Sequence, residues 1–218
     1  MQTANVHIER YDPESGACRT ETYSVELKEN DTVLQALLRI YEERDSTLAF
    51  RHGCRGSRCG QCVLQVDGMP RLACATRARD GMTLSPLKNL PSLRDLIFDR
   101  SAVDRRISSQ RLYVMPPIQA ALGELSVPEA YGRLIGCLEC YGCMASCPRF
   151  DWRDESFGGP YVFVRLALLH LDPRDQEDRR AQARALGVDE CAGCSACRCV
   201  KGIAIRRDAI GMLLGQES

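Results

Sequence analysis

The pattern of apolar and polar positions gives the chain a β-rich beginning. Apolar and polar residues alternate along residues 6–11 and again along residues 19–27, with a polar turn segment between them. This alternation is typical of strands, and the short turn predicts that the two strands pair as a hairpin. Residues 33–41 then repeat apolar positions at helical spacing behind Asn30-Asp31-Thr32, a segment whose side chains can cap a helix. We therefore expect strands and a helix in this part.

Beyond about residue 100 the pattern becomes helical. Residues 161–171 are almost entirely apolar, which predicts a helix that stops before Asp172-Pro173. Residues 174–184 carry many charges and are expected to form a solvated helix. We place the domain boundary within residues 101–105, so that the first domain covers residues 1–103 and the second covers residues 104–218. The expected fold class is α+β.

Charge and hydropathy argue against several classes of protein. Lys+Arg and Asp+Glu both number 29, so the net charge of zero gives no general attraction to nucleic acid or to an anionic membrane. The chain has no long apolar run and no signal-peptide pattern, so we expect a protein of the cytoplasm, or one at the cytoplasmic face of a membrane complex. No general base, nucleophile or phosphate loop is evident, and we expect no catalytic residue.

The cysteines change this picture, because there are thirteen of them and twelve fall into three groups. The exception is Cys18, for which we expect a free thiol. Nothing in the sequence indicates secretion, so disulfide bonds are not expected. Grouped cysteines are typical of metal ligands, and the candidates are iron–sulfur clusters or zinc. Four closely spaced cysteines that end in a proline fit zinc knuckles poorly, which favours iron and sulfur.

The first group has the spacing C-x4-C-x2-C-x11-C, and its members are Cys54, Cys59, Cys62 and Cys74. Its first three members match the plant-type pattern for a [2Fe–2S] cluster, and the fourth follows after a spacer. The loop between them is rich in glycine, which allows backbone N–H groups to turn toward the sulfur atoms. We expect a [2Fe–2S] site here.

The other two groups predict a pair of clusters. The second group reads C-x2-C-x2-C-x3-C-P and consists of Cys137, Cys140, Cys143 and Cys147. The third consists of Cys191, Cys194, Cys197 and Cys199, so its last member follows after one residue. In the bacterial ferredoxin pattern the fourth cysteine binds the other cluster. We expect such an exchange, because Cys197 and Cys199 reach one cluster together only with difficulty; four ligands from each run is the alternative. One [4Fe–4S] cluster would then use Cys137, Cys140, Cys143 and Cys199, and a distal cluster would use Cys147, Cys191, Cys194 and Cys197.

With these motifs, the chain resembles the iron–sulfur subunits of succinate dehydrogenases and fumarate reductases over nearly its whole length. The segments that carry the resemblance are residues 32–37, 47–51, 54–62, 71–74, 93–96, 137–148, 159–160, 172–175 and 199–203. It implies a plant-ferredoxin-like β-grasp domain with [2Fe–2S], followed by an all-α, bacterial-ferredoxin-like domain with two further clusters. It also implies a relay of single electrons between a flavoprotein subunit that holds FAD and does the substrate chemistry, and a membrane anchor that serves a quinone pool.

The chain departs from the family pattern at two positions. Relatives with a [3Fe–4S] centre lack the middle cysteine of the last motif, where this chain has Cys194, so the ligand count favours a second [4Fe–4S] cluster over [3Fe–4S]. Trp152 matches a tryptophan that can line the family's quinone pocket, although it is equally suited to packing. Ala192 stands where the family has a histidine, and it cannot carry protons. An equivalent subunit of a different flavoprotein or thiol-linked reductase is the alternative function, and a zinc-knuckle binding module is a third.

Overall fold

The structure is a computed structural model that describes residues 2–115 and 126–216. Contacts between residues divide the chain into two compact units, Met1–Arg100 and Ser101–Ser218. The boundary predicted after residue 103 lies inside helix α2 (Arg100–Ser108). No helix among the described residues is long and apolar enough to cross a membrane.

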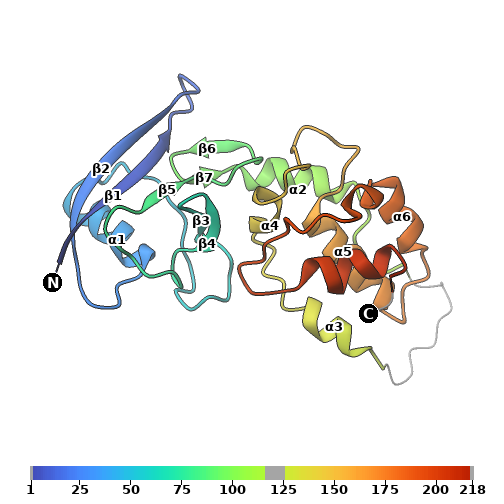
Figure 1. The fold of residues 1–218 in the computed structure, drawn as a ribbon. Helices are drawn as coiled ribbons and strands as arrows, with labels where there is room; N and C mark the ends of the chain where they lie inside the picture. Colours follow the sequence, from blue (N-terminus) through green and yellow to red (C-terminus); the bar gives the residue numbers. More distant parts are fainter. Residues whose placement is uncertain (1, 116–125, 217–218) are drawn as a thin grey trace. The chain divides into compact units, whose positions relative to one another are not determined.

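A five-stranded sheet with the order β2-β1-β5-β3-β4 forms the first unit (Figure 1). Its strands are β1 (Gln2–Tyr11), β2 (Cys18–Leu27), β3 (Val63–Val66), β4 (Met69–Leu72) and β5 (Thr83–Ser85). Strand β1 pairs antiparallel with β2, which confirms the predicted hairpin, and parallel with β5. A second, two-stranded sheet pairs β6 (Ser92–Arg94) with β7 (Ile97–Phe98).

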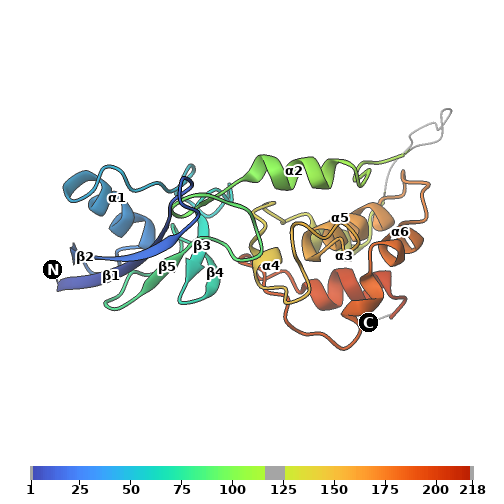
Figure 2. The same ribbon diagram turned by 90° about the horizontal axis from the view of Figure 1, so that it is seen from above.

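Helix α1 (Val33–Glu43) lies along one face of the sheet (Figure 2). Thr32, the last residue of the predicted capping segment, caps it: its hydroxyl accepts the Gln35 N–H at 3.3 Å, and the Gln35 side chain accepts the Thr32 N–H at 2.8 Å. The alternating pattern of β1 turns Val6 and Ile8 into the core, and both are fully buried. The same period places Arg10 on the buried side, where a charge needs partners.

Helix α5 (Pro160–Leu171) is the centre of the second unit and ends before Asp172, as the sequence predicts. It contacts three other helices and a π-helical segment, which are α3 (Glu129–Leu134), α4 (Gly142–Ala145), α6 (Arg179–Ala185) and η2 (Arg206–Gly211). Gly159 begins it with a φ of +84°, and a Cβ there would lie 2.6 Å from the Phe150 ring. A side chain at residue 159 would therefore be strained and would also clash with that ring.

The prediction of a solvated helix over residues 174–184 is wrong in two respects. The helix begins only at Arg179, because aspartate side chains bind the preceding backbone; Asp172 accepts the Arg174 N–H at 3.0 Å. Asp178 then caps the helix by accepting the Ala181 N–H at 2.9 Å. Arg179 is also buried, with 1% of its side chain exposed, and pairs with Asp175 at 2.5 Å. A charge-rich pattern does not reveal such a buried ion pair.

Candidate metal centres

The loop that carries the first cysteine group directs backbone N–H groups at sulfur. The Cys54 sulfur accepts the N–H groups of Gly56 at 3.4 Å and Arg58 at 3.3 Å, and the Cys59 sulfur accepts the Cys54 N–H at 3.4 Å. The N–H groups of Gly56 and Arg58 are the main reason why the pKa of the Cys54 thiol is lowered to about 6. Donors that stabilise a thiolate also stabilise the negative charge of a cluster bound there.

The glycine-rich sequence suggests that glycine makes the turns of this loop, but other residues make some of them. Arg55 and Ser57 both have left-handed backbone conformations, with φ values of 55° and 57°, and Gly60 has a φ of 69°. Such values are uncommon outside glycine. Each of the two left-handed residues is followed by a residue, Gly56 or Arg58, whose N–H binds the Cys54 sulfur. Gly53 serves another purpose, because a Cβ at this residue would lie 3.3 Å from the Cys59 sulfur.

The remaining two members of the first group meet beside this loop. Ala73 donates its N–H to the Cys62 carbonyl at 3.0 Å, which holds the chain next to Cys74 against β3. The Ser57 hydroxyl lies 3.8 Å from the Cys74 sulfur, so the loop contacts this fourth cysteine. Burial, together with the neighbouring Cys74 and Cys59 thiols, raises the pKa of the Cys62 thiol to about 11. The described contacts thus join all four predicted ligands.

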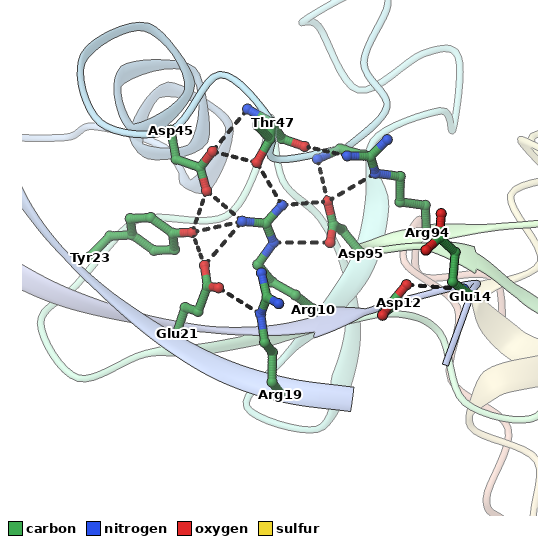
Figure 3. Close-up of polar contacts among 11 residues, drawn as sticks. Arg10, Asp12, Glu14, Arg19, Glu21, Tyr23, Asp45, Thr47, Arg94 and Asp95 are labelled. Atoms are coloured by element: carbon green, nitrogen blue, oxygen red, sulfur yellow. Dashed lines mark hydrogen bonds and ion pairs between the residues drawn. The ribbon is translucent and has the colours of Figure 1, made fainter. Parts of the chain in front are cut away.

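Arg10 holds the segment that leads into this loop (Figure 3). Its side chain is only 6% exposed, and it donates to both carboxylate oxygens of Asp95, at 2.9 and 3.1 Å. Asp95 in turn accepts the Ala49 N–H at 2.8 Å. The network therefore fixes residues 45–49, a few residues before Cys54. The other acceptors of the guanidinium are Glu21 at 3.0 Å, Tyr23 at 3.1 Å, Thr47 at 3.1 Å and Asp45.

In the second unit, the Cys137–Cys147 run wraps tightly before and within α4. Glu139 and Tyr141 have left-handed conformations, with φ values of 52° and 63°. Their turns direct the Gly142 N–H toward the Cys140 sulfur, while burial raises the pKa of this thiol to about 11. Burial also raises the pKa of the Cys143 thiol well above its ordinary value. Buried thiols at close spacing suit metal ligands, which lose their protons on binding.

The run from Cys191 to Cys199 lies directly against the first run. The Ser146 hydroxyl accepts the Arg198 N–H at 3.2 Å and donates to the Cys143 carbonyl at 3.0 Å. Arg149 binds Glu190 with two hydrogen bonds, of 2.5 and 3.3 Å. Two contacts thus join the runs. Arg149 and Glu190 connect the end of the first run to the residue before Cys191. Ser146, directly before Cys147, binds Arg198, which lies between Cys197 and Cys199. Sequence reasoning missed these joints, since nothing local links residues so far apart in the chain.

Electrostatic contacts sort the eight cysteines of this unit into two sets. The charge of Cys199 acts on three thiols of the first run, which are Cys137, Cys140 and Cys143. The charge of Cys147 acts instead on Cys191 and Cys197, and Cys194 acts on these two and on Cys147. Cys197 also contributes to the raised pKa of the Cys143 thiol, so the two sets lie next to each other.

A single metal ion and a cluster make different demands on these residues. Within residues 2–115 and 126–216, no three His, Cys, Asp or Glu side chains converge to hold one ion. In a cluster the four thiolates are divided among several irons, two on each iron of [2Fe–2S] and one on each iron of [4Fe–4S], so the ligands stand further apart around a larger group. The donor set here is soft thiolate sulfur with N–H groups directed at it, which fits iron–sulfur clusters.

Trp152 lines a small cavity that also includes Met144 of the first cysteine run. The Arg153 guanidinium stacks 5.1 Å from the centre of the Trp152 ring, and the cavity also includes residues of α2 and α5, among them Val103 and Val162. Ala192 is exposed, immediately after Cys191.

We expect the cluster-free protein to lose stability as the pH rises above about 9. Burial raises the pKa of the folded Cys140 and Cys197 thiols to about 11 and that of Cys191 to about 12, whereas an unfolded thiol has a pKa of about 8.5. Between these values the folded chain binds more protons, so its free energy of unfolding falls with rising pH; below them the contribution is fully present.

Thermal unfolding of reduced, anaerobic apoprotein checks this expectation across the alkaline range. The melting temperature should fall from about pH 9 to about pH 11, and Cys191→Ala should reduce the slope. The matched control is Cys18→Ala, because Cys18 is exposed and lies outside the three groups, and this variant should keep the wild-type slope. A slope that Cys191→Ala leaves unchanged would contradict the prediction.

Comparison with protein families matches each unit separately. Residues 5–105 match the family described as "2Fe-2S iron-sulfur cluster binding domain", and residues 136–204 match the "4Fe-4S dicluster domain". Together the two matches cover the three cysteine groups.

Comparison with whole proteins gives relatives along nearly the entire chain. The fumarate reductase iron-sulfur subunit of Mycobacterium tuberculosis is 31% identical over 219 residues, covering 93% of this chain and 88% of the relative. A subunit of the fumarate reductase (CoM/CoB) from Methanothermobacter marburgensis is 32% identical over 215 residues, covering 96% of this chain but 43% of the relative. This chain therefore spans less than half of the length of that longer relative.

A solved structure has the same fold. A chain of the Mycobacterium smegmatis Sdh1 complex in the apo form superposes with a TM-score of 0.87 at 27% sequence identity. The match covers 98% of this chain and 95% of that chain, so both units have counterparts in it.

Proposed function

Because this chain belongs to the family of iron–sulfur subunits of succinate dehydrogenases and fumarate reductases, we propose that it relays single electrons between an FAD-binding subunit and a membrane anchor that serves a quinone pool. It is an electron-transfer subunit of an oxidoreductase complex of this type. The substrate chemistry, succinate oxidation or fumarate reduction, belongs in this proposal to the flavoprotein. The relay would work at the cytoplasmic face of the membrane.

Three clusters would supply the one-electron redox centres of this relay, and the chain supplies their ligands and surroundings. We assign the [2Fe–2S] cluster to Cys54, Cys59, Cys62 and Cys74. The N–H groups of Gly56 and Arg58 stabilise negative charge at Cys54 and so favour the reduced state at this site. Arg10 and Asp95 keep the entrance of the loop in place.

The contact between the two runs of the second unit is the observation that carries the proposal. Ser146 precedes Cys147, and its partner Arg198 separates Cys197 from Cys199, so ligands of both centres lie beside this hydrogen bond. The electrostatic contacts of Cys199 with the first run, and of Cys147 with the second, support an exchange of ligands. We assign Cys137, Cys140, Cys143 and Cys199 to the middle [4Fe–4S] cluster. Cys147, Cys191, Cys194 and Cys197 then bind the distal cluster.

The distal centre has four thiolates available, which supports [4Fe–4S] over [3Fe–4S] there. Cys194 is half-buried and contributes to the raised pKa of the Cys147, Cys191 and Cys197 thiols, which supports its placement near them. One thiolate for each iron then completes a four-iron cluster. An EPR signal of an oxidised three-iron centre in fresh anaerobic protein would contradict this assignment.

A quinone contact at Trp152 also belongs to the proposal. The indole N–H is a hydrogen-bond donor that a quinone oxygen can accept. Ala192 offers no proton donor next to Cys191, so any proton delivered to a quinone must come from a group other than the residue at this position.

Anaerobic purification of the native complex tests the proposed function. We expect a flavoprotein with bound FAD to copurify, the visible spectrum and EPR signals of three clusters, and electron transfer from succinate to a dye. A colourless chain with stoichiometric zinc would overturn the proposal.

The alternative function is that of the equivalent subunit in a thiol-linked reductase or with a different flavoprotein. It is supported by the similarity to a subunit of a fumarate reductase whose name refers to CoM and CoB. The same purified complex separates the two functions: the alternative predicts that thiols of low molecular weight reduce its clusters, while succinate and quinol do not.

A further inference from the structure

An open cavity of about 540 Å³ lies beside the distal cysteines and carries several arginines. Cys197 is part of its lining, together with Arg198, Arg206 and Arg207. Positive charge therefore gathers next to one of the predicted ligands. The three arginines differ in their partners, and this difference decides what each can do.

Arg207 is exposed and its charge is compensated. It donates to both carboxylate oxygens of Asp208, at 2.8 and 3.1 Å. Arg206 is half-buried and donates to the neutral Gln216 side chain at 3.3 Å. Arg198 is exposed and donates to the Ser195 and Cys197 carbonyls, at 2.8 and 3.2 Å. Within the described residues, neither Arg198 nor Arg206 has an acidic side chain as a salt-bridge partner.

These two arginines lie beside a distal ligand. Both line the cavity that Cys197 also lines, and Arg198 directly follows Cys197 and donates to its carbonyl at 3.2 Å. Because Arg206 is less exposed than Arg198, solvent and salt screen its charge less.

The other [4Fe–4S] site is arranged differently. The positive charge that acts on Cys137 belongs to Arg165, and its guanidinium lies 3.3 Å from the Glu139 carboxylate. A paired arginine adds little net charge to its surroundings. Of the two [4Fe–4S] sites, the distal one is thus the site beside which arginine side chains of the described residues lack an acidic partner.

We propose that Arg206, with a smaller contribution from Arg198, raises the reduction potential of the cluster at Cys147, Cys191, Cys194 and Cys197. One-electron reduction adds a negative charge, which a nearby cation favours, and net charge is one of the quantities that set cluster potentials. The effect offsets the extra negative charge that Cys194 brings as a fourth thiolate. This inference rests on the ligand assignment in the proposed function.

Redox titration of the purified complex, followed by EPR, tests the role of Arg206. We expect Arg206→Gln to shift the distal potential to a more negative value and to leave the other two potentials unchanged. Arg206→Lys keeps the charge and should therefore retain most of the wild-type potential. The matched control is the double variant Arg207→Gln with Asp208→Asn, since it removes both charges of an ion pair next to the same cavity and leaves the net charge unchanged, and it should have the wild-type potential.

An unchanged distal potential in Arg206→Gln, or an equal shift at all three clusters, would overturn the proposal. If this variant loses its distal cluster, Arg198→Gln tests the proposal in its place. It must then show a negative shift of the distal potential, and an unchanged potential would overturn the proposal. Iron content and EPR of the wild-type complex are recorded first. Fewer than three clusters in wild type would mean that the proposed function fails, which is distinct from a failure of the arginine effect in a complex with all three.

Discussion

Replacing Cys199 with serine is expected to eliminate the cluster of residues 137–143 and to leave the distal cluster bound. Serine offers a hard hydroxyl in place of a soft thiolate, so one iron of the middle cluster loses its ligand. Cys199 contributes to the raised pKa of the Cys137, Cys140 and Cys143 thiols, which indicates that it lies near them. EPR and iron content of anaerobically purified protein measure the loss. We expect about four of the bound irons to disappear, following the composition of one cluster.

Cys147→Ser provides the reciprocal experiment. It should remove the distal cluster and spare the middle one, although Cys147 belongs to the first run in sequence. Cys18→Ser is the control, since Cys18 is exposed at the start of β2 and lies outside the cysteine groups. If each run binds its own cluster, the outcomes reverse, and Cys199→Ser would destroy the distal centre.

Replacing Arg10 with methionine should destabilise the first unit by about 3–5 kcal/mol, the usual cost of removing one partner from a buried ion pair. Methionine retains much of the aliphatic bulk, but Asp95 would be left buried without its two hydrogen bonds from the guanidinium. Glu21 and Asp45 would also lose their shared cation, so three carboxylates would repel one another.

Hydrogen exchange of the full chain measures this effect, because it reports on each unit separately. Protection should fall in β1 and β5 and stay unchanged in α5. Arg19→Met is the matched control: Arg19 pairs with Glu21 in the same network, but 67% of its side chain is exposed, so it should cost about 1 kcal/mol or less. Equal effects of the two variants would show that Arg10 is not the buried centre of the network.

The elements of the fold were predictable where a local pattern determines them. The hairpin follows from alternation along β1 and β2, and α1 follows from Thr32 and the apolar spacing behind it. The late start of α6 was missed because the carboxylates of Asp172 and Asp178 bind nearby backbone N–H groups in competition with a helix.

The ligands were predictable for a different reason than their surroundings. Cysteine spacing identifies candidates directly, because a cluster restricts which spacings can wrap around it. The partners of Arg10 come from β2, the segment after α1 and the turn after β6, so no window of sequence contains them. The period of β1 did indicate a buried Arg10, which was the one available signal. The left-handed turns at Arg55 and Ser57 had no signal, since neither residue type favours them.

The hydrogen bond between Ser146 and Arg198 has a consequence for the assembly of the clusters. With exchanged ligands, both clusters cross-link the same two runs and so close the same loop, from Cys147 to Cys191. Closing a loop of about 45 residues costs about 4 kcal/mol of chain entropy at room temperature. When the clusters assemble on the newly made, still unfolded chain, the first cluster to bind must overcome that cost, and the second enters a loop that is already closed. Filling should therefore be cooperative, with few half-filled molecules, and a chain that retains one cluster should release it to an iron chelator more readily than the complete protein does.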